Sequence, residues 1–461
     1  MSSRLRQTLL LSLEDEASVE VPVVETGADS LEGELAGVIA ADQEVVDSDQ
    51  AVEDLTDVQA TLESLAITVE QSLADGGLTP REAALVEQVY QASAGRVGLK
   101  SKVPSMESFG GSSDRERATR VTLEGFKESV QRIWQAILNV LKKWWIQIDK
   151  FFYKVFNAAP KLMGRANALA KAASEHKEEM NVGAKLKLSG LHAELAGGNA
   201  VQAANDLRQV TADIFEKYSK EMVEYGEKCA NYLKGVEVED DAKFDASAYK
   251  IGEIAYPVPA SCSVQANPSD YGAQGQHKVK TTKPLPGGKV LAVVYADVHE
   301  KYHEESGVRA YLGAMAASRA TLAPAKGHEE AKEGEHAPLS KENIVAMAKD
   351  VSAIAQDVVV FQRGYNGTKT VRGALETAGN EYSKKDGSKL TGERVSLAAE
   401  LPKLVNTAGK NVDAAQRALA GYVITTGAAL VQLGEQSLKQ HGGKKEAPEA
   451  KPEEKPAAAA A

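Results

Sequence analysis

Residues 130–156 read VQRIWQAILNVLKKWWIQIDKFFYKVF, and this stretch indicates the class of fold. Its apolar residues recur every three or four positions, which is the spacing of one wide face of an α-helix. They are Val130, Ile133, Trp134, Ile137, Leu141, Trp144, Trp145, Ile148, Phe151, Phe152 and Val155. A helix with so wide an apolar face needs a surface to cover it, so the stretch predicts a helical core.

Three roles are open to this helix. It can lie in the core of a bundle, dock onto a partner or a second copy, or lie on a membrane surface. Its cations are weak candidates for contact with DNA or a protein shell, and they are Lys142, Lys143, Lys150 and Lys154. Because charged residues interrupt it, no apolar run of about 18 residues exists, and we expect no stable membrane insertion.

The composition favours helices over a β-sandwich. The chain has 461 residues, of which 43% are hydrophobic and only 5% aromatic, so it has enough apolar residues for packed cores in two or three domains. Its two cysteines, Cys229 and Cys262, exclude a disulfide scaffold and a cysteine-rich zinc module.

Charge is unevenly distributed along the chain. Residues 1–107 hold 21 acidic and 6 basic side chains, a net charge of −15. The remainder holds 44 of the 65 acidic and 48 of the 54 basic residues, a net charge of +4. An acidic segment repels DNA, whereas a near-neutral body tolerates DNA nearby. The plainer alternative is a solvating acidic region beside an ordinary domain.

The patterns together predict a fold that is mainly α with a small β-element (α+β), built as an elongated helical bundle with a disordered C-terminal tail. Five parts are expected along the chain: an acidic helical segment at 1–107, a helical unit with the Trp-rich helix at 108–240, a small β-containing insertion at 241–297, a C-terminal helical unit at 298–441 and the tail at 442–461.

Local signals place the helix boundaries. A long helix is expected over 28–73, ended by Asp75-Gly76-Gly77, and the capping box Thr79-Pro80-Arg81-Glu82 opens the next. Asn199 is the expected N-cap of a helix over 200–233. Further helices are predicted over 160–180, 184–195, 298–323, 341–361 and 397–438.

One string suggests catalysis. His299-Glu300-Lys301-Tyr302-His303 matches HExxH, which on a helix places two imidazoles one turn apart to bind zinc, with Glu300 as general base. The sequence therefore allows a zinc metallopeptidase as an alternative function. Against it, Lys301 is charged, and no histidine follows at the position of a third ligand, so a charged, solvated helix start explains the string as well. Because the chain also lacks Gly-rich phosphate loops, we expect no cofactor.

A short motif lies where the charge changes sign. Ser105-Met106-Glu107 is a small-x-Glu triplet within the Gly- and Ser-rich linker 95–114, a type of segment that proteases reach easily. Similar triplets occur by chance in acidic sequence, for example Ala51-Val52-Glu53 and Ala398-Ala399-Glu400. The position of Ser105-Met106-Glu107, rather than its composition, makes it a candidate processing site.

Three strings resemble internal head proteins of giant tailed bacteriophages: SMESFG at 105–110, TLEGFKES at 122–129 and FFYKVFNAAPKL at 151–162. Proteins of that family enter the inner core of the prohead. A prohead protease cuts them after a small-x-Glu motif and removes an acidic propeptide. The resemblance therefore implies a non-enzymatic structural protein of the virion, with Glu107 as the last propeptide residue and Ser108 as the mature N-terminus.

The resemblance also implies partners and a location. The partners would be the prohead protease, acting on this chain as its substrate, the capsid shell, other core proteins and packaged DNA. The mature protein would lie in the capsid interior after assembly in the cytoplasm of the host bacterium. The charge arithmetic agrees, since a cut after Glu107 separates a net charge of −15 from the remainder.

Overall fold

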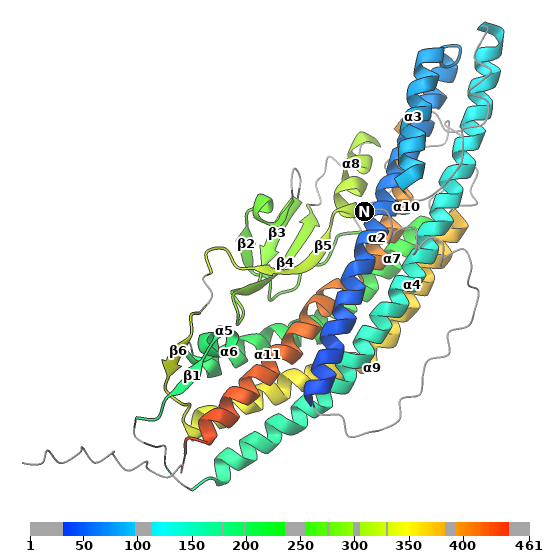
Figure 1. Ribbon diagram of the computed structural model, residues 1–461. Helices are drawn as coiled ribbons and strands as arrows, with labels where there is room; N and C mark the ends of the chain where they lie inside the picture. The colour runs from blue at the N-terminus through cyan, green and yellow to red at the C-terminus, as the bar shows by residue number, and fades with distance from the viewer. Residues whose placement is uncertain are drawn as a thin grey trace, which may run out of the picture.

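Helices make up most of the computed structural model, which describes residues 31–96, 112–235, 254–297, 305–382 and 393–441, apart from 178, 180, 182, 198, 274–276 and 329–330. Figure 1 shows an elongated bundle of long helices with a small sheet on one flank. The prediction of a mainly α fold with a small β-element is therefore confirmed. The predicted tail at 442–461 lies outside the described residues.

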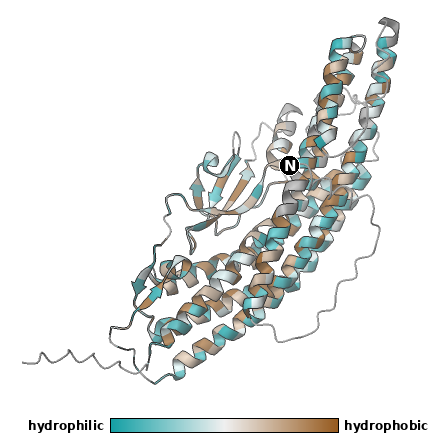
Figure 2. Ribbon diagram, viewed as in Figure 1, coloured by the Kyte–Doolittle hydropathy of each residue, from teal (hydrophilic) through white to brown (hydrophobic). Residues whose placement is uncertain are grey.

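The Trp-rich stretch lies in the longest helix, α4 (Ser112–Glu175), between α2 (Leu31–Ala74) and α9 (Lys341–Tyr382). Its large side chains are buried, as with Trp144 and Phe152, and Phe152 contacts the rings of Phe361 and Tyr365 in α9. The core role is therefore confirmed for this helix. Figure 2 shows the apolar residues of the bundle on the faces where its helices meet.

The helix predicted to begin at Pro160 is instead the continuation of α4 through that residue. Proline removes one backbone donor and its ring crowds the preceding turn, which destabilises a helix interior. Here the flanking residues Ala158, Ala159 and Leu162 are fully buried. Packing of both flanks against the bundle therefore outweighs the local effect of the proline.

The N-terminal helix pair consists of α2 and α3 (Pro80–Arg96). Gly76 and Gly77 have φ of 85° and 91° and turn the chain, as predicted. A Cβ at Gly77 would lie 2.8 Å from the Arg115 carbonyl carbon, so the close approach to α4 also requires glycine. The capping box is confirmed, because the Glu82 carboxylate accepts the Thr79 N–H at 2.8 Å while Thr79 Oγ1 accepts the Glu82 N–H at 3.3 Å.

Shorter helices complete the bundle. Asn199 caps the second of them as predicted, since its Oδ1 accepts the N–H of Val201 at 3.1 Å. Between the second and third, six residues form a π-helical turn, η2 (Asp213–Tyr218). The helices are α5 (Gly190–Gly197), α6 (Ala200–Ala212), α7 (Ser219–Gly235), α8 (Glu305–Ala316), α10 (Glu393–Asn411) and α11 (Ala414–Leu438).

The main sheet has four antiparallel strands in the order β2-β3-β4-β5. They are β2 (Val264–Ala266), β3 (His277–Thr281), β4 (Lys289–Ala296) and β5 (Arg319–Pro324). A two-stranded sheet pairs β1 (Leu186–Leu188) with β6 (Gly334–His336), and a short 3-10 helix, η6 (Pro268–Tyr271), follows β2. The sheet thus takes its fourth strand from beyond the predicted insertion at 241–297.

Strand β5 also replaces the second half of the helix predicted over 298–323, where only α8 is helical. The central strand β4 is buried along most of its length and needs a neighbour on each edge. Pairing of Leu322 with Leu291 and of Ala320 with Val293 supplies that neighbour. Tertiary pairing therefore decides the conformation of this segment over its local periodicity.

A buried ionic cluster lies where α4, α9 and α11 meet. Arg372 of α9 binds Asp413, the residue before α11, and both are almost fully buried. Arg372 also binds Asp149 of α4 at 2.9 Å, and the Tyr365 hydroxyl donates to the same carboxylate at 2.8 Å. The prediction of a single helix over 397–438 is wrong, because Asp413 lies between α10 and α11. Its carboxylate binds the buried guanidinium of Arg372.

Candidate functional site

The two motifs predicted from sequence fall, in chain order, between described elements. Ser105, Met106, Glu107 and Ser108 fall between the end of α3 at Arg96 and the start of α4 at Ser112. His299, Glu300 and His303 fall between β4 and α8. Both sets lie outside the described residues, so the processing site and the zinc site stay predictions. Within the described part of the chain, no group of three or more potential metal ligands comes together.

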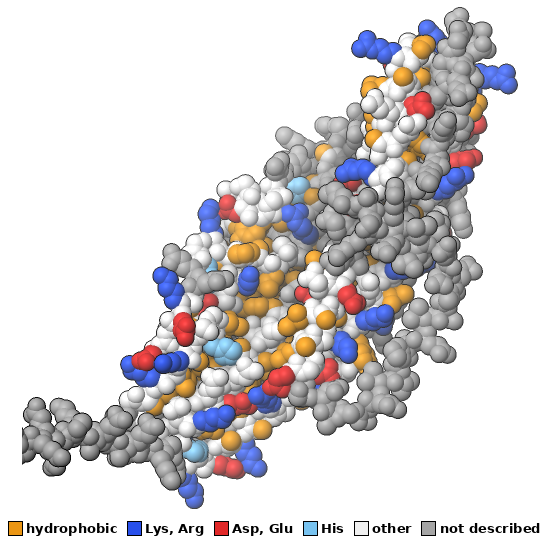
Figure 3. Space-filling view, viewed as in Figure 1, with side chains coloured by type: hydrophobic (Ala, Val, Ile, Leu, Met, Phe, Trp, Pro, Cys, Tyr) orange, Lys and Arg blue, Asp and Glu red, His pale blue; other side chains and the backbone are white. Residues whose placement is uncertain are grey.

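The four lysines predicted for DNA or shell contact lie on α4 but in different surroundings. Lys142 pairs with Glu376 of α9 at 2.8 Å. Lys150 is exposed, Lys143 is half-buried, and the half-buried Lys154 side chain lies against Gly37 of α2. Figure 3 shows Lys and Arg side chains interspersed with Asp and Glu on the face in view. The four lysines therefore differ in exposure, and Lys142 is already neutralised by α9.

Carboxylates of the acidic segment bind cations of α4. Glu34 pairs with Lys161 at 2.9 Å. Glu32 pairs with Arg165 at 2.6 Å, and the same guanidinium binds Glu435 of α11 through its Nε at 2.8 Å. The hydrogen bond that Arg165 donates to Glu435 is the main cause that raises the pKa of Arg165 above its ordinary value. Arg165 thus joins the first turn of α2 to the last two turns of α11. Sequence reasoning missed these pairs, because their members lie far apart in the chain.

An apolar stripe on α2 faces the same partners. Its side chains repeat largely every seven residues, and all are at most 6% exposed: Leu31, Val38, Val45, Val52, Leu55, Val58, Leu62 and Val69. A Cβ at Gly421 of α11 would lie 3.7 Å from Val38 and 3.8 Å from Phe151, so three helices meet at this point. The stripe belongs to the same buried cluster as the aromatic residues of α4.

Two hydrogen bonds hold the far end of the N-terminal helix pair. The buried N–H of Leu78 donates to Thr119 Oγ1 at 2.9 Å. The Tyr90 hydroxyl of α3 and the Ser129 hydroxyl lie 2.9 Å apart, within hydrogen-bonding distance. Both partners belong to the first third of α4, so the pair contacts α4 near both of its ends.

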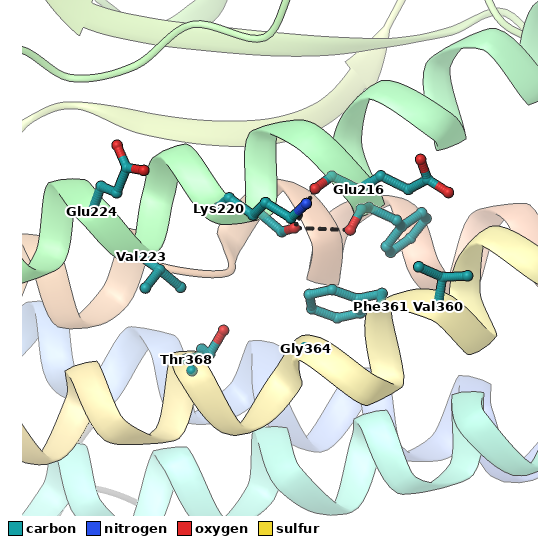
Figure 4. A pocket seen from close by; sticks show the side chains of 11 residues that line it. Glu216, Lys220, Val223, Glu224, Val360, Phe361, Gly364 and Thr368 are labelled. Atoms are coloured by element: carbon teal, nitrogen blue, oxygen red, sulfur yellow. Dashed lines mark hydrogen bonds between the residues drawn. The ribbon is translucent and has the colours of Figure 1, made fainter.

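An open pocket of about 450 Å³ lies between α7 and α9, beside the π-helical turn (Figure 4). Phe215 and Phe361 form its apolar wall, and Gly364 and Gly367 leave the space open. Glu216 and Lys220 lie at its border, and the hydroxyl of Ser219 donates to the Phe215 carbonyl at 2.8 Å. The Ser219 hydroxyl is thus bonded to the helix backbone rather than to a base.

The two cysteines are buried and have raised pKa values. Cys229 of α7 and Cys262 are both buried, and burial raises the pKa of each thiol to about 12. At neutral pH both are therefore protonated, whereas metal binding and nucleophilic attack require the thiolate.

Comparison with known proteins identifies the family of the chain. None of the described helices is both long enough and apolar enough to cross a bilayer. Searches of curated proteins and of solved structures find no match. A family model of phiKZ-like phage internal head proteins matches residues 14–436, which is most of the chain and includes the acidic segment, the bundle and the sheet. The chain therefore belongs to the phiKZ-like phage internal head proteins.

Proposed function

We propose that this protein is a structural component of the inner core of the phage head and that it is matured by a cut after Glu107. The family match carries the first part of the proposal, because it covers nearly the whole chain. The second part is supported by position, since Ser105-Met106-Glu107 falls between two helices and a cut there breaks neither. Proteases act most readily on exposed segments between elements of secondary structure.

The proposed role is structural rather than catalytic. The prohead protease would be the enzyme and this chain its substrate. Inside the capsid the protein would contact the shell, other core proteins and packaged DNA, after assembly in the cytoplasm of the host bacterium. Among the lysines of α4, Lys150 is the best candidate for contact with phosphate, because it is exposed. Lys142 is the weakest, because Glu376 already neutralises it.

The decisive experiment is N-terminal sequencing, with mass spectrometry, of the protein taken from purified particles. We expect the mature chain to begin at Ser108. A Glu107→Gln variant carried by the phage should keep residues 105–110 in one uncut peptide. The matched control is Glu400→Gln in the similar triplet of α10, which should leave processing unchanged. A wild-type particle protein that begins anywhere else, or that is never cut, would contradict the proposed maturation.

A further inference from the structure

We propose that residues 31–96, the N-terminal helix pair, stay bound to the rest of the protein after the cut. The inference rests on the proposed cut after Glu107 and states what that cut produces. The product is a two-chain protein, in which the N-terminal helix pair remains docked along α4, rather than a free acidic fragment and a separate mature body.

Burial along the whole length of α2 supports retention. Eight valines and leucines from Leu31 to Val69 are at most 6% exposed, and they belong to the same apolar cluster as Trp144 and Phe151 of α4. Each fully buried side chain of this size strengthens association by roughly tenfold to a hundredfold. A cut between α3 and α4 removes none of these contacts, because it breaks only the covalent connection.

Polar contacts fix the register at both ends of the helix pair. Near the start of α2, Glu32 and Glu34 bind Arg165 and Lys161. Near its end, the buried N–H of Leu78 donates to Thr119. Loss of the helix pair would leave these groups without their partners and would expose the apolar side chains of α4 beneath it. An apolar surface of that extent on a free protein promotes aggregation, so the docked state is favoured.

The docked helix pair is also protected from a second cut. The triplet Ala51-Val52-Glu53 lies within α2, where the backbone is helical and Val52 is fully buried. Proteases act on exposed connecting segments, so this triplet is inaccessible while α2 stays docked. The acidic segment therefore leaves only if the bundle opens.

The test uses the full chain with the recognition sequence of a site-specific protease inserted after Glu107. After complete cleavage, gel filtration and native mass spectrometry should recover both pieces together, with the summed mass of the uncut chain. Separate elution of the two pieces at micromolar concentration would overturn the inference.

Two neighbouring valines provide a matched pair of variants. Val45 is 1% exposed and Val46 is 53% exposed on the same helix. In the cut protein, V45A should speed exchange of a labelled N-terminal piece for an unlabelled one by at least about tenfold, because it leaves a cavity in the interface. V46A should leave the exchange rate unchanged. Equal effects of the two substitutions would show that α2 does not dock by this face.

The peptides recovered from purified phage particles distinguish the proposed cut after Glu107 from the proposed retention of residues 31–96. A chain that begins at Ser108, accompanied by equimolar peptides from residues 31–96, supports both. A chain that begins at Ser108 without those peptides supports the cut and overturns retention. If the particle protein lacks a terminus at Ser108, the proposed cut fails, and the result with the inserted protease site still decides whether the helix pair stays bound.

Discussion

Arg372 and Asp413 show how strongly single residues hold this core. They bind each other almost without contact to solvent, and each lies in a different segment of the bundle. Removal of one partner from a buried ion pair leaves an uncompensated charge in a medium of low polarity. Replacement of both partners by apolar residues removes that penalty. The sign of the effect therefore depends on whether one charge or both are changed.

We expect Asp413→Leu to lower the free energy of unfolding by about 3–5 kcal/mol, measured by urea denaturation. The double variant Arg372→Leu/Asp413→Leu should recover a large part of that loss. As a control, Lys142→Ala removes the more exposed pair with Glu376 and should lower stability by less than about 1 kcal/mol. A double variant less stable than Asp413→Leu would refute this account of the cluster.

Asp357 makes the stability depend on pH. Burial is the main cause that raises the pKa of its carboxyl to about 6; a hydrogen bond from Thr211 acts in the opposite direction, and the nearby Glu216 carboxylate contributes to the rise. In the unfolded chain the pKa lies near 4. The folded protein therefore binds this proton more tightly. The resulting penalty is absent below about pH 4 and complete above about pH 6, so this group lowers stability as pH rises.

Asp357→Asn should therefore raise the free energy of unfolding at pH 7.5 by roughly 1 kcal/mol, a value reduced for partial exposure to solvent. At pH 4 the variant and the wild type should differ little. Urea midpoints measured from pH 4 to 8 check this expectation. A difference that stays constant over the whole range would mean that Asp357 does not titrate as described.

Helix packing in this molecule depends on where glycine lies. At Gly226 of α7, an added Cβ would collide with the Val371 side chain of α9, whereas at Gly373 of α9 it would meet open space. Gly226→Ala should lower stability by about 1–3 kcal/mol through overpacking. Gly373→Ala should raise it by up to about 1 kcal/mol, because alanine favours the helix. Thermal unfolding followed by circular dichroism measures both. A stabilising Gly226→Ala would mean that α7 and α9 are less closely packed.

Sequence patterns predict those elements whose signals are local. The turn at Gly76 and Gly77, the capping box at Thr79 and the Asn199 cap each depend on neighbours within a few residues, and all are present in the structure. Strand β5 and the break at Asp413 depend on β4 and Arg372, which are distant in the chain. Local periodicity gives no information about such partners, so these two features were not predictable.

At the scale of the whole molecule, the charge of the N-terminal segment and the packing of residues 31–96 lead to different expectations about whether the segment belongs to the body. The net charge of −15 over residues 1–107 sets this segment apart from the near-neutral body. Its buried valines, and the pairing of Glu32 and Glu34 with cations of α4, instead make residues 31–96 a structural part of the bundle. The composition of a segment gives its net charge but does not show which of its side chains are buried. The candidate processing site was therefore found from sequence, whereas the docking surface became visible only in the fold.

The buried thiols of Cys229 and Cys262 make the native chain a convenient scaffold for site-selective labelling. Because both sulfur atoms are protonated and enclosed, a maleimide dye at neutral pH would react far faster with a cysteine newly introduced at an exposed position. One such position on α3, Leu85, and one on α4, Lys150, would accept a donor and an acceptor fluorophore. Energy transfer between them would then report the distance between α3 and α4 in real time, without prior removal of any native cysteine.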